Sequence, residues 1–274
     1  FFVPKDFTHL KSYSNGICVI DLFRNPKTHS RNQPFSSGII TANDALLIQL
    51  SKERLSNDIQ RVLSKNYTKE DMKREFNPGN TYLKWFFTPG VYRPSKHKQA
   101  SFDAQRITRL IYRPFDFRYI YYDPLLIHQS RAAVMKPLLK ENIAIIVSRT
   151  VQGDVFWRDI QVTDSITEFG IMASRVGNAA PICPIFHYKN GIRESNFHQT
   201  TTDSLVKNYD VPLDLLSTDF GKNNVITGVD IVYYVLAVLS SPRYRTKYQD
   251  LLKSGFPFVP KNLPLKVFRT LVQK

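Results

Sequence analysis

Residues 112–148 constrain the fold of this chain more than any other stretch. Residues 119–122 are aromatic and β-branched, a composition that favours a β-strand. Residues 143–147 form a short, continuous apolar run, which is typical of a strand buried on both faces. The two runs together predict a β-sheet in the core of the protein.

Arginines are interleaved with the aromatic residues at the start of this stretch. In one interpretation, Arg113 and Arg118 only form ion pairs with the neighbouring acids Asp116 and Asp123. The connector that follows is basic, because no acid falls between Asp123 and Glu141. Local pairing therefore does not account for the basic charge that recurs along the chain.

Other segments predict both strands and helices. Short runs predict strands at residues 16–23, 45–50, 107–112, 162–167 and 182–188. Helical spacing relates Leu55, Ile59 and Val62, and Thr68 with Asp71 forms a capping box that opens a second helix. Residues 189–208 are polar and rich in turn residues, so we expect an exposed segment there.

The last third of the chain has a helical period. Thr227 with Asp230 caps one helix, and Ser241 followed by Pro242 begins the next. We therefore expect an α+β fold with a mixed β-sheet core, flanking helices and a helical C-terminal part. The expected division is a domain at residues 1–200 and a helical subdomain at residues 201–274.

The charge balance indicates a polyanionic partner. The 38 Lys and Arg residues exceed the 23 Asp and Glu residues, which gives a formal charge of +15. That excess favours nucleic acid or an anionic membrane surface. No apolar run approaches the roughly 20 residues that span a bilayer. Cys18 and Cys183 lack metal-ligand spacing, so we expect free thiols, no metal site and a cytoplasmic protein.

Sequence motifs for catalysis are absent. The chain has no glycine-rich phosphate loop, no Asp/Asn-Pro-Pro-Tyr/Phe motif of the N6-adenine methyltransferases, and no paired-acid and lysine signature of nucleases. The six histidines are scattered along the sequence. We therefore assign no catalytic residue.

Several blocks of the chain resemble, in order, the C-terminal specificity region of the type ISP restriction-modification enzymes. In chain order, the first four blocks read SSGIITANDALLI from residue 36, YRPFDFRYIYYD from residue 112, SRAAVMKPLLKENIAIIVSR from residue 130 and VTDSITEFGIMASR from residue 162. Two later blocks, CPIFHY from residue 183 and VYYVLAVLSSPRYRTKYQDLLKSGFPFVP from residue 232, continue the match. The resemblance implies DNA target recognition within a single-chain enzyme that also has nuclease, helicase-like and N6-adenine methyltransferase parts.

Two positions depart from the family pattern. The family usually has Thr-Gly where this chain has Thr41-Ala42, so the glycine of a tight turn is missing. The usual Arg-Pro-Arg-Trp block reads Gln129-Ser130-Arg131-Ala132, so only Arg131 carries over. The chain begins at Phe1 without a methionine, and we expect it to be a fragment of the parent enzyme.

Loop residues supply the chemistry for binding duplex DNA. Lys and Arg contact phosphates, Arg also reads guanine, and Gln reads adenine. The candidate DNA-binding residues are Arg31, Gln33, Arg93, Lys96, Lys98, Arg131, Arg149, Gln152 and Arg158.

The loop from Arg149 to Arg158 is the candidate for reading bases. It follows a buried strand, and its Trp157 and flexible Gly153 suit insertion into a groove. The alternative is an ordinary hairpin in which Arg158 pairs with Asp154 or Asp159.

The resemblance and the charge favour one function over two others. We expect a non-catalytic specificity module that binds duplex DNA and works with the methyltransferase and helicase-like domains of the same chain. The resemblance implies that those parts use S-adenosylmethionine and ATP, and we expect no cofactor in this fragment. The alternatives are a stand-alone nucleic-acid-modifying enzyme and a basic protein-interaction module.

Overall fold

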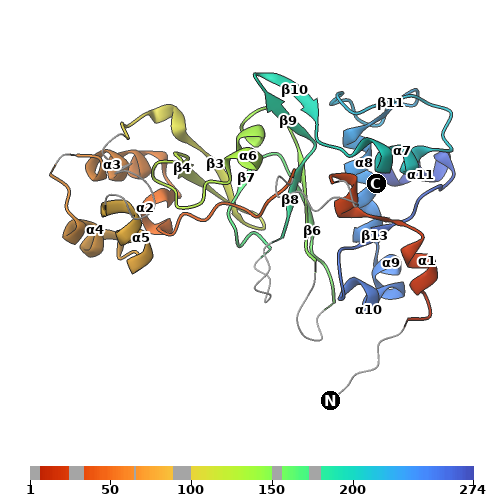
Figure 1. The fold of residues 1–274 in the computed structure, drawn as a ribbon, viewed down its shortest axis with the longest axis horizontal. Helices are drawn as coiled ribbons and strands as arrows, with labels where there is room; N and C mark the ends of the chain where they lie inside the picture. The colour runs from red at the N-terminus through yellow and green to blue at the C-terminus, as the bar shows by residue number, and fades with distance from the viewer. Residues whose placement is uncertain (1–6, 25–33, 65, 89–99, 150–155, 173–179) are drawn as a thin grey trace, which may run out of the picture. The chain divides into compact units, whose positions relative to one another are not determined.

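The computed structural model describes residues 7–24, 34–64, 66–88, 100–149, 156–172 and 180–274 (Figure 1). They form two compact units. Unit 1 comprises Phe1–Ser37, Lys136–Asp164 and Met172–Lys274, and unit 2 comprises Gly38–Met135 and Ser165–Ile171. The expected domain boundary at residue 200 thus falls inside unit 1, which the chain leaves after Ser37 and enters again at Lys136.

Unit 2 is built on a mixed four-stranded sheet in the order β2-β4-β3-β7. Strands β2 and β3 pair antiparallel with β4, and β7 pairs parallel with β3. Its elements are α2 (Asp44–Leu47), β2 (Ile48–Gln49), α3 (Lys52–Val62), α4 (Lys69–Phe76), α5 (Asn80–Phe87), η3 (Ala104–Arg106), β3 (Ile107–Arg113), β4 (Asp116–Tyr121), α6 (Ala132–Met135) and β7 (Ile166–Thr167). The mixed sheet with helices beside it confirms the expected α+β class (Figure 1).

Local signals explain the helices of unit 2. Ser51 caps α3, which buries Leu55, Ile59 and Val62 as the spacing predicts. The capping box of Thr68 and Asp71 is present at the start of α4.

The strand expected at residues 45–50 is wrong in its first half, which forms the short helix α2. The Asn43 side chain accepts a hydrogen bond from the Leu46 amide at 3.3 Å, and this cap starts a helical turn. Only Ile48–Gln49 remains as strand β2.

Unit 1 combines a three-stranded antiparallel sheet, in the order β6-β5-β8, with the C-terminal helices. Strand β5 is buried along its whole length, as its apolar run predicts. The elements of unit 1 are α1 (Leu10–Ser14), β1 (Ile17–Cys18), η1 (Val19–Leu22), η4 (Lys136–Leu139), β5 (Ala144–Val147), β6 (Ile160–Thr163), β8 (Ile182–Pro184), β9 (Phe186–Lys189), β10 (Ile192–Ser195), α7 (Gln199–Val206), β11 (Leu213–Asp214), β12 (Ile226–Thr227), α8 (Gly228–Ser240), α9 (Pro242–Lys247), α10 (Gln249–Leu252), β13 (Phe258–Val259) and α11 (Leu265–Val272).

Helix α8 lies at the centre of the core of unit 1. Thr227 and Asp230 form the predicted capping box, and Ser241 caps α9 by accepting from the Tyr244 amide. Tyr234 of α8 is buried and its ring packs on Phe268 of α11, with 4.9 Å between centroids. The apolar face of α8 is therefore a packing surface.

Three strand or loop predictions in the rest of the chain need correction. Residues 16–23 form only the short β1 before the 3-10 helix η1. Residues 162–167 are split between β6 in unit 1 and β7 in unit 2. Residues 189–208 contain β10 and α7. Asn190 and Gly191 have positive φ angles of 51° and 84°, and they close the β9–β10 hairpin.

Candidate nucleic-acid interface

Three of the nine predicted DNA-binding residues lie in the described part of the chain: Arg131 in unit 2, and Arg149 and Arg158 in unit 1. The other six lie outside the described residues: Arg31, Gln33, Arg93, Lys96, Lys98 and Gln152.

The β5–β6 hairpin brings Arg149 and Arg158 to the same place. Its antiparallel register pairs Val147 with Ile160, and the Ser148 amide donates to the Asp159 carbonyl at 3.0 Å. Beyond this bond, Arg149 is the next residue after Ser148 and Arg158 is the residue before Asp159. Both side chains are exposed.

A third arginine, Arg245 of α9, completes the group. Its Nε donates to the Leu239 carbonyl at 2.5 Å, and its guanidinium lies 6.0 Å from the Trp157 ring centroid. Burial lowers the pKa of Arg245, and the positive charge of Arg158 lowers that pKa further. Two guanidinium groups therefore repel each other here. We refer to Arg149, Arg158 and Arg245 as the arginine cluster.

The nearest acid in the hairpin is engaged elsewhere. Asp159 accepts a hydrogen bond from Ser148 Oγ at 2.9 Å, and burial raises the pKa of its carboxyl group. Within the described residues, no carboxylate forms an ion pair with a member of the arginine cluster. The alternative in which Arg158 pairs with Asp159 is therefore wrong, while Asp154 lies outside the described residues.

The aromatic residues of the loop divide between core and surface. Trp157 is only 2% exposed and belongs to the core of unit 1, so its expected insertion into a groove is wrong. Phe156, the residue before it, is 51% exposed. Next to the arginine cluster, the exposed Phe156 is therefore the ring available for contact with a partner.

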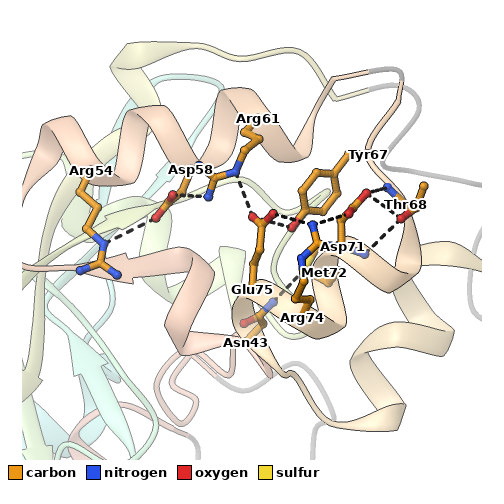
Figure 2. Close-up of polar contacts among 10 residues, drawn as sticks. All are labelled: Asn43, Arg54, Asp58, Arg61, Tyr67, Thr68, Asp71, Met72, Arg74 and Glu75. Atoms are coloured by element: carbon orange, nitrogen blue, oxygen red, sulfur yellow. Dashed lines mark hydrogen bonds and ion pairs between the residues drawn. The ribbon is translucent and has the colours of Figure 1, made fainter.

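Several other arginines on the surface are neutralised by acids, as Figure 2 shows for helices α3 and α4. Arg61 pairs with Asp58 at 2.7 Å and with Glu75 at 2.9 Å, and Arg74 pairs with Asp71 at 2.6 Å. The Arg61–Glu75 pair ties α3 to α4, and the other two lie within one helix each. Such arginines stabilise unit 2 and leave little free charge for a polyanion.

Tyr112, Arg113 and Arg118 of the aromatic motif have a structural role. The Tyr112 ring lies between two guanidinium groups, with Arg113 at 4.1 Å and Arg118 at 3.9 Å from its centroid. Arg118 pairs with Asp116 at 2.8 Å, which confirms half of the local-pairing interpretation. Arg113 instead pairs with Glu168, and Asp123 pairs with Arg106.

Arg131 is less accessible than the hairpin arginines. Its φ angle is 50°, and its carbonyl accepts from the Val134 and Met135 amides at the start of α6. Its Nε is buried and has no hydrogen-bond partner among the described residues. The structure therefore gives Arg131 a local role at the start of a helix.

The described residues contain no group of three or more potential metal ligands and no helix long and apolar enough to cross a membrane. An open hollow of about 430 Å³ lies between β10, α7 and β11. Its charged residues are engaged, because Arg193 pairs with Glu141 at 3.2 Å and Glu194 contacts His187 at 2.8 Å. This arrangement offers no nucleophile with an adjacent base.

A family model identifies the class to which this chain belongs. The Type ISP C-terminal specificity domain matches residues 33–274, so the chain is a member of that family. The resemblance found in the sequence blocks is thereby confirmed. No curated protein matches the chain.

Solved structures share the fold at low sequence identity. The DrdV–DNA complex is 19% identical with a TM-score of 0.64, and the match covers 93% of this chain and 24% of that one. A nuclease-deletion mutant of the Type ISP enzyme LlaGI with a DNA substrate mimic is 19% identical, with a TM-score of 0.59 and coverages of 98% and 23%. DNA-bound LlaBIII, an ATP-dependent Type ISP enzyme, is 16% identical, with a TM-score of 0.66 and coverages of 95% and 16%. The chain thus spans a quarter or less of each of these proteins.

Proposed function

We propose that this chain recognises a DNA target sequence on behalf of a restriction-modification enzyme and performs no catalysis itself. Membership in a specificity-domain family supports this proposal, as do the DNA complexes of the proteins that share its fold. The observation that carries it is the arginine cluster, whose three members have no ion-pair partner among the described residues and in which Arg245 lies beside Trp157, the residue before Arg158. A phosphate backbone would compensate this charge.

The hairpin gives the cluster a rigid base. Strand β5 is buried and held between β6 and β8, so Arg149 follows directly from a fixed element. Arg158 precedes β6 and is fixed in the same way. Rigid arginines can form bidentate contacts with guanine as well as with phosphate, whereas a mobile lysine makes only a point contact. Arg149 and Arg158 are therefore placed for base reading, and the partly buried Arg245 for phosphate.

The remaining chemistry belongs to other parts of the parent enzyme. The chain lacks the motif with which N6-adenine methyltransferases hold the target amine, and it lacks a glycine-rich loop for ATP phosphates. We therefore assign S-adenosylmethionine to the methyltransferase part and ATP to the helicase-like part. An adenine methyltransferase must extrude its base from the duplex. In this proposal, the chain holds the duplex in the cytoplasm while those parts act on it.

A salt titration of DNA binding tests the proposal. We expect wild-type affinity for a duplex to fall steeply with salt, and Arg245→Gln to reduce the salt slope by about one unit. Arg149→Gln or Arg158→Gln should each cost about 1–3 kcal/mol on the cognate duplex and relax specificity at one position. Arg54→Gln removes the same charge from an arginine that already faces Asp58, and this control should leave the slope unchanged. Robust methyltransferase, ATPase or nuclease turnover by the chain, or no binding at low salt, would overturn the proposal.

A further inference from the structure

The tip of the β3–β4 hairpin in unit 2 holds an aromatic residue that the fold does not need. Arg113 and Asp116 lie opposite each other in the β3–β4 register. Pro114 and Phe115, the two residues between them, therefore form a two-residue turn. Phe115 has a φ angle of 65°, in the left-handed region where a turn normally places glycine or asparagine. Its side chain is 94% exposed and therefore buries almost nothing in exchange for that backbone strain. An observed strain without a packing benefit indicates a role in binding.

The sheet behind this tip presents an open face of aromatic and basic residues. Arg109 lies opposite Tyr119 in the β3–β4 register, and directly opposed side chains point to the same side of a sheet. Phe117 follows the same alternation and is 44% exposed. At the far end of this face Phe102 stacks on Tyr121, with 5.9 Å between ring centroids, and closes it.

Both exposed cations on this face lie over aromatic rings. The Arg109 guanidinium is 3.8 Å from the Phe117 centroid, and Lys52 Nζ is 5.0 Å from the Tyr119 centroid. Neither cation has an ion-pair partner among the described residues. Glu53, the acid next to Lys52, accepts from Ser51 Oγ at 2.6 Å. This arrangement differs from that of Arg113 and Arg118 on the same hairpin, which carboxylates neutralise.

From these contacts we infer that the hairpin face, defined as Lys52, Arg109, Phe115, Phe117 and Tyr119, is a second contact surface for duplex DNA. This inference rests on the proposed function and adds a surface in unit 2 to the arginine cluster in unit 1. Arg109 and Lys52 meet phosphates, and Phe115 is an apolar wedge that enters a groove. Exposed apolar side chains at the tip of a narrow element are used in this way to unstack base steps.

The spacing of the face fits one DNA strand. Phe117 and Tyr119 are two residues apart on β4, which places their two cations about 7 Å apart along the strand. Each strand of a duplex carries a phosphate for every 3.4 Å or so of helix axis. Both cations can therefore meet phosphates of the same strand.

The test separates the wedge from the cations by their salt dependence. Phe115→Gly should weaken duplex binding by about tenfold without changing the salt slope, because an apolar contact releases no counterions. It should also raise the melting temperature by about 2–4 °C, since glycine relieves the left-handed strain. Arg109→Gln and Lys52→Gln should each lower the salt slope by about one unit, with Arg54→Gln as the charge-matched control.

A fluorescent reporter identifies the occupant of the face. In Phe115→Trp, the introduced indole should shift its emission to the blue or be quenched when duplex DNA is added. A shift that instead follows protein concentration without DNA would assign the face to a second copy of the chain and overturn the inference.

The two proposals fail in different ways. If the wild-type chain binds DNA and Arg149→Gln weakens it, while the Phe115, Arg109 and Lys52 variants bind like wild type, the hairpin face is not a DNA surface and the proposed function stands. If the wild-type chain does not bind duplex DNA at low salt, both proposals are wrong.

Discussion

The Ser148 hydroxyl donates a hydrogen bond to the Asp159 carboxylate at 2.9 Å in the β5–β6 hairpin. The neighbouring Arg149 and Arg158 are exposed to solvent. The carboxylate still contributes to the local charge, because it raises the pKa of Arg245 against the effects of burial and of Arg158. Asp159 is thus a negative charge in the hairpin that works against the binding of a polyanion.

Replacing Asp159 with asparagine should therefore strengthen DNA binding. Asp159→Asn removes the negative charge and keeps an oxygen that can accept from Ser148. A partly screened charge interaction is worth about 1 kcal/mol or less, so we expect a two- to fivefold gain in affinity for any duplex. Fluorescence anisotropy at fixed salt measures the gain. Weaker binding would mean that Asp159 orients the arginines.

The same variant should change the pH dependence of stability. Burial raises the pKa of Asp159 in the folded chain above 3.8, so the charged carboxylate costs stability at neutral pH. That cost disappears as the pH falls through the pKa of Asp159 in the folded chain. The Asp159→Asn variant does not carry this cost at any pH, because asparagine is uncharged. Urea denaturation at pH 7 and at pH 4 should show wild type gaining stability relative to Asp159→Asn as the pH is lowered. A constant difference would contradict this sign.

Ala42 occupies a left-handed position, with a φ angle of 59°. The sequence lacks the family's glycine here, yet the turn keeps a conformation that favours glycine. Ala42→Gly should therefore stabilise the chain by about 0.5–1 kcal/mol. Ala45→Gly, within helix α2, is the matched control and should destabilise it by up to about 1 kcal/mol. Equal effects in denaturant titrations would mean that Ala42 carries no strain.

The turn at Ala42 illustrates what the sequence could and could not predict. Short-range signals predicted the capping boxes at Thr68 and Thr227 because both partners are three residues apart. The Asn43 cap and the Asn190-Gly191 turn were equally local signals, and weighing them would have placed α2 and the β9–β10 hairpin correctly. A conformation imposed on alanine by its surroundings has no such local signal.

The candidate interface shows the same division. Arg149 and Arg158 could be predicted because they lie close in sequence to β5 and β6, which are neighbours along the chain. Arg245 could not, because its proximity to Arg158 arises when α9 packs beside Trp157, about 90 residues along the chain. The sequence also favoured Trp157 for contact with a groove, whereas Trp157 is buried and the neighbouring Phe156 is exposed. Tertiary packing therefore decides which residues complete the site.

The capping box of α4 should make unit 2 sensitive to acid (Figure 2). Hydrogen bonds from Thr68 and the contact with Arg74 lower the pKa of Asp71 from 3.8 to about 2. A lowered carboxyl pKa contributes stability above pH 3.8 that is lost as the pH falls towards 2. Asp71→Asn should lower the denaturation midpoint at pH 7 and flatten its decline between pH 4 and pH 2. Parallel pH profiles for the two proteins would contradict a role for this cap.

The final prediction concerns two adjacent tyrosines on α8. Tyr234 is buried against Phe268, whereas Tyr233 is 36% exposed and contacts Phe220 at 4.7 Å between ring centroids. Tyr234→Asp places an unpaired charge in the core of unit 1 and should destabilise it by more than about 4 kcal/mol, which unfolds the unit.

Tyr233→Asp makes the same chemical change one residue away and should cost less than about 1.5 kcal/mol, because water still reaches the new carboxylate. Circular dichroism and DNA binding, measured together, distinguish the two outcomes. If Tyr234→Asp keeps native circular dichroism and loses only DNA affinity, then this face of α8 contacts DNA, and its assignment to the core is wrong.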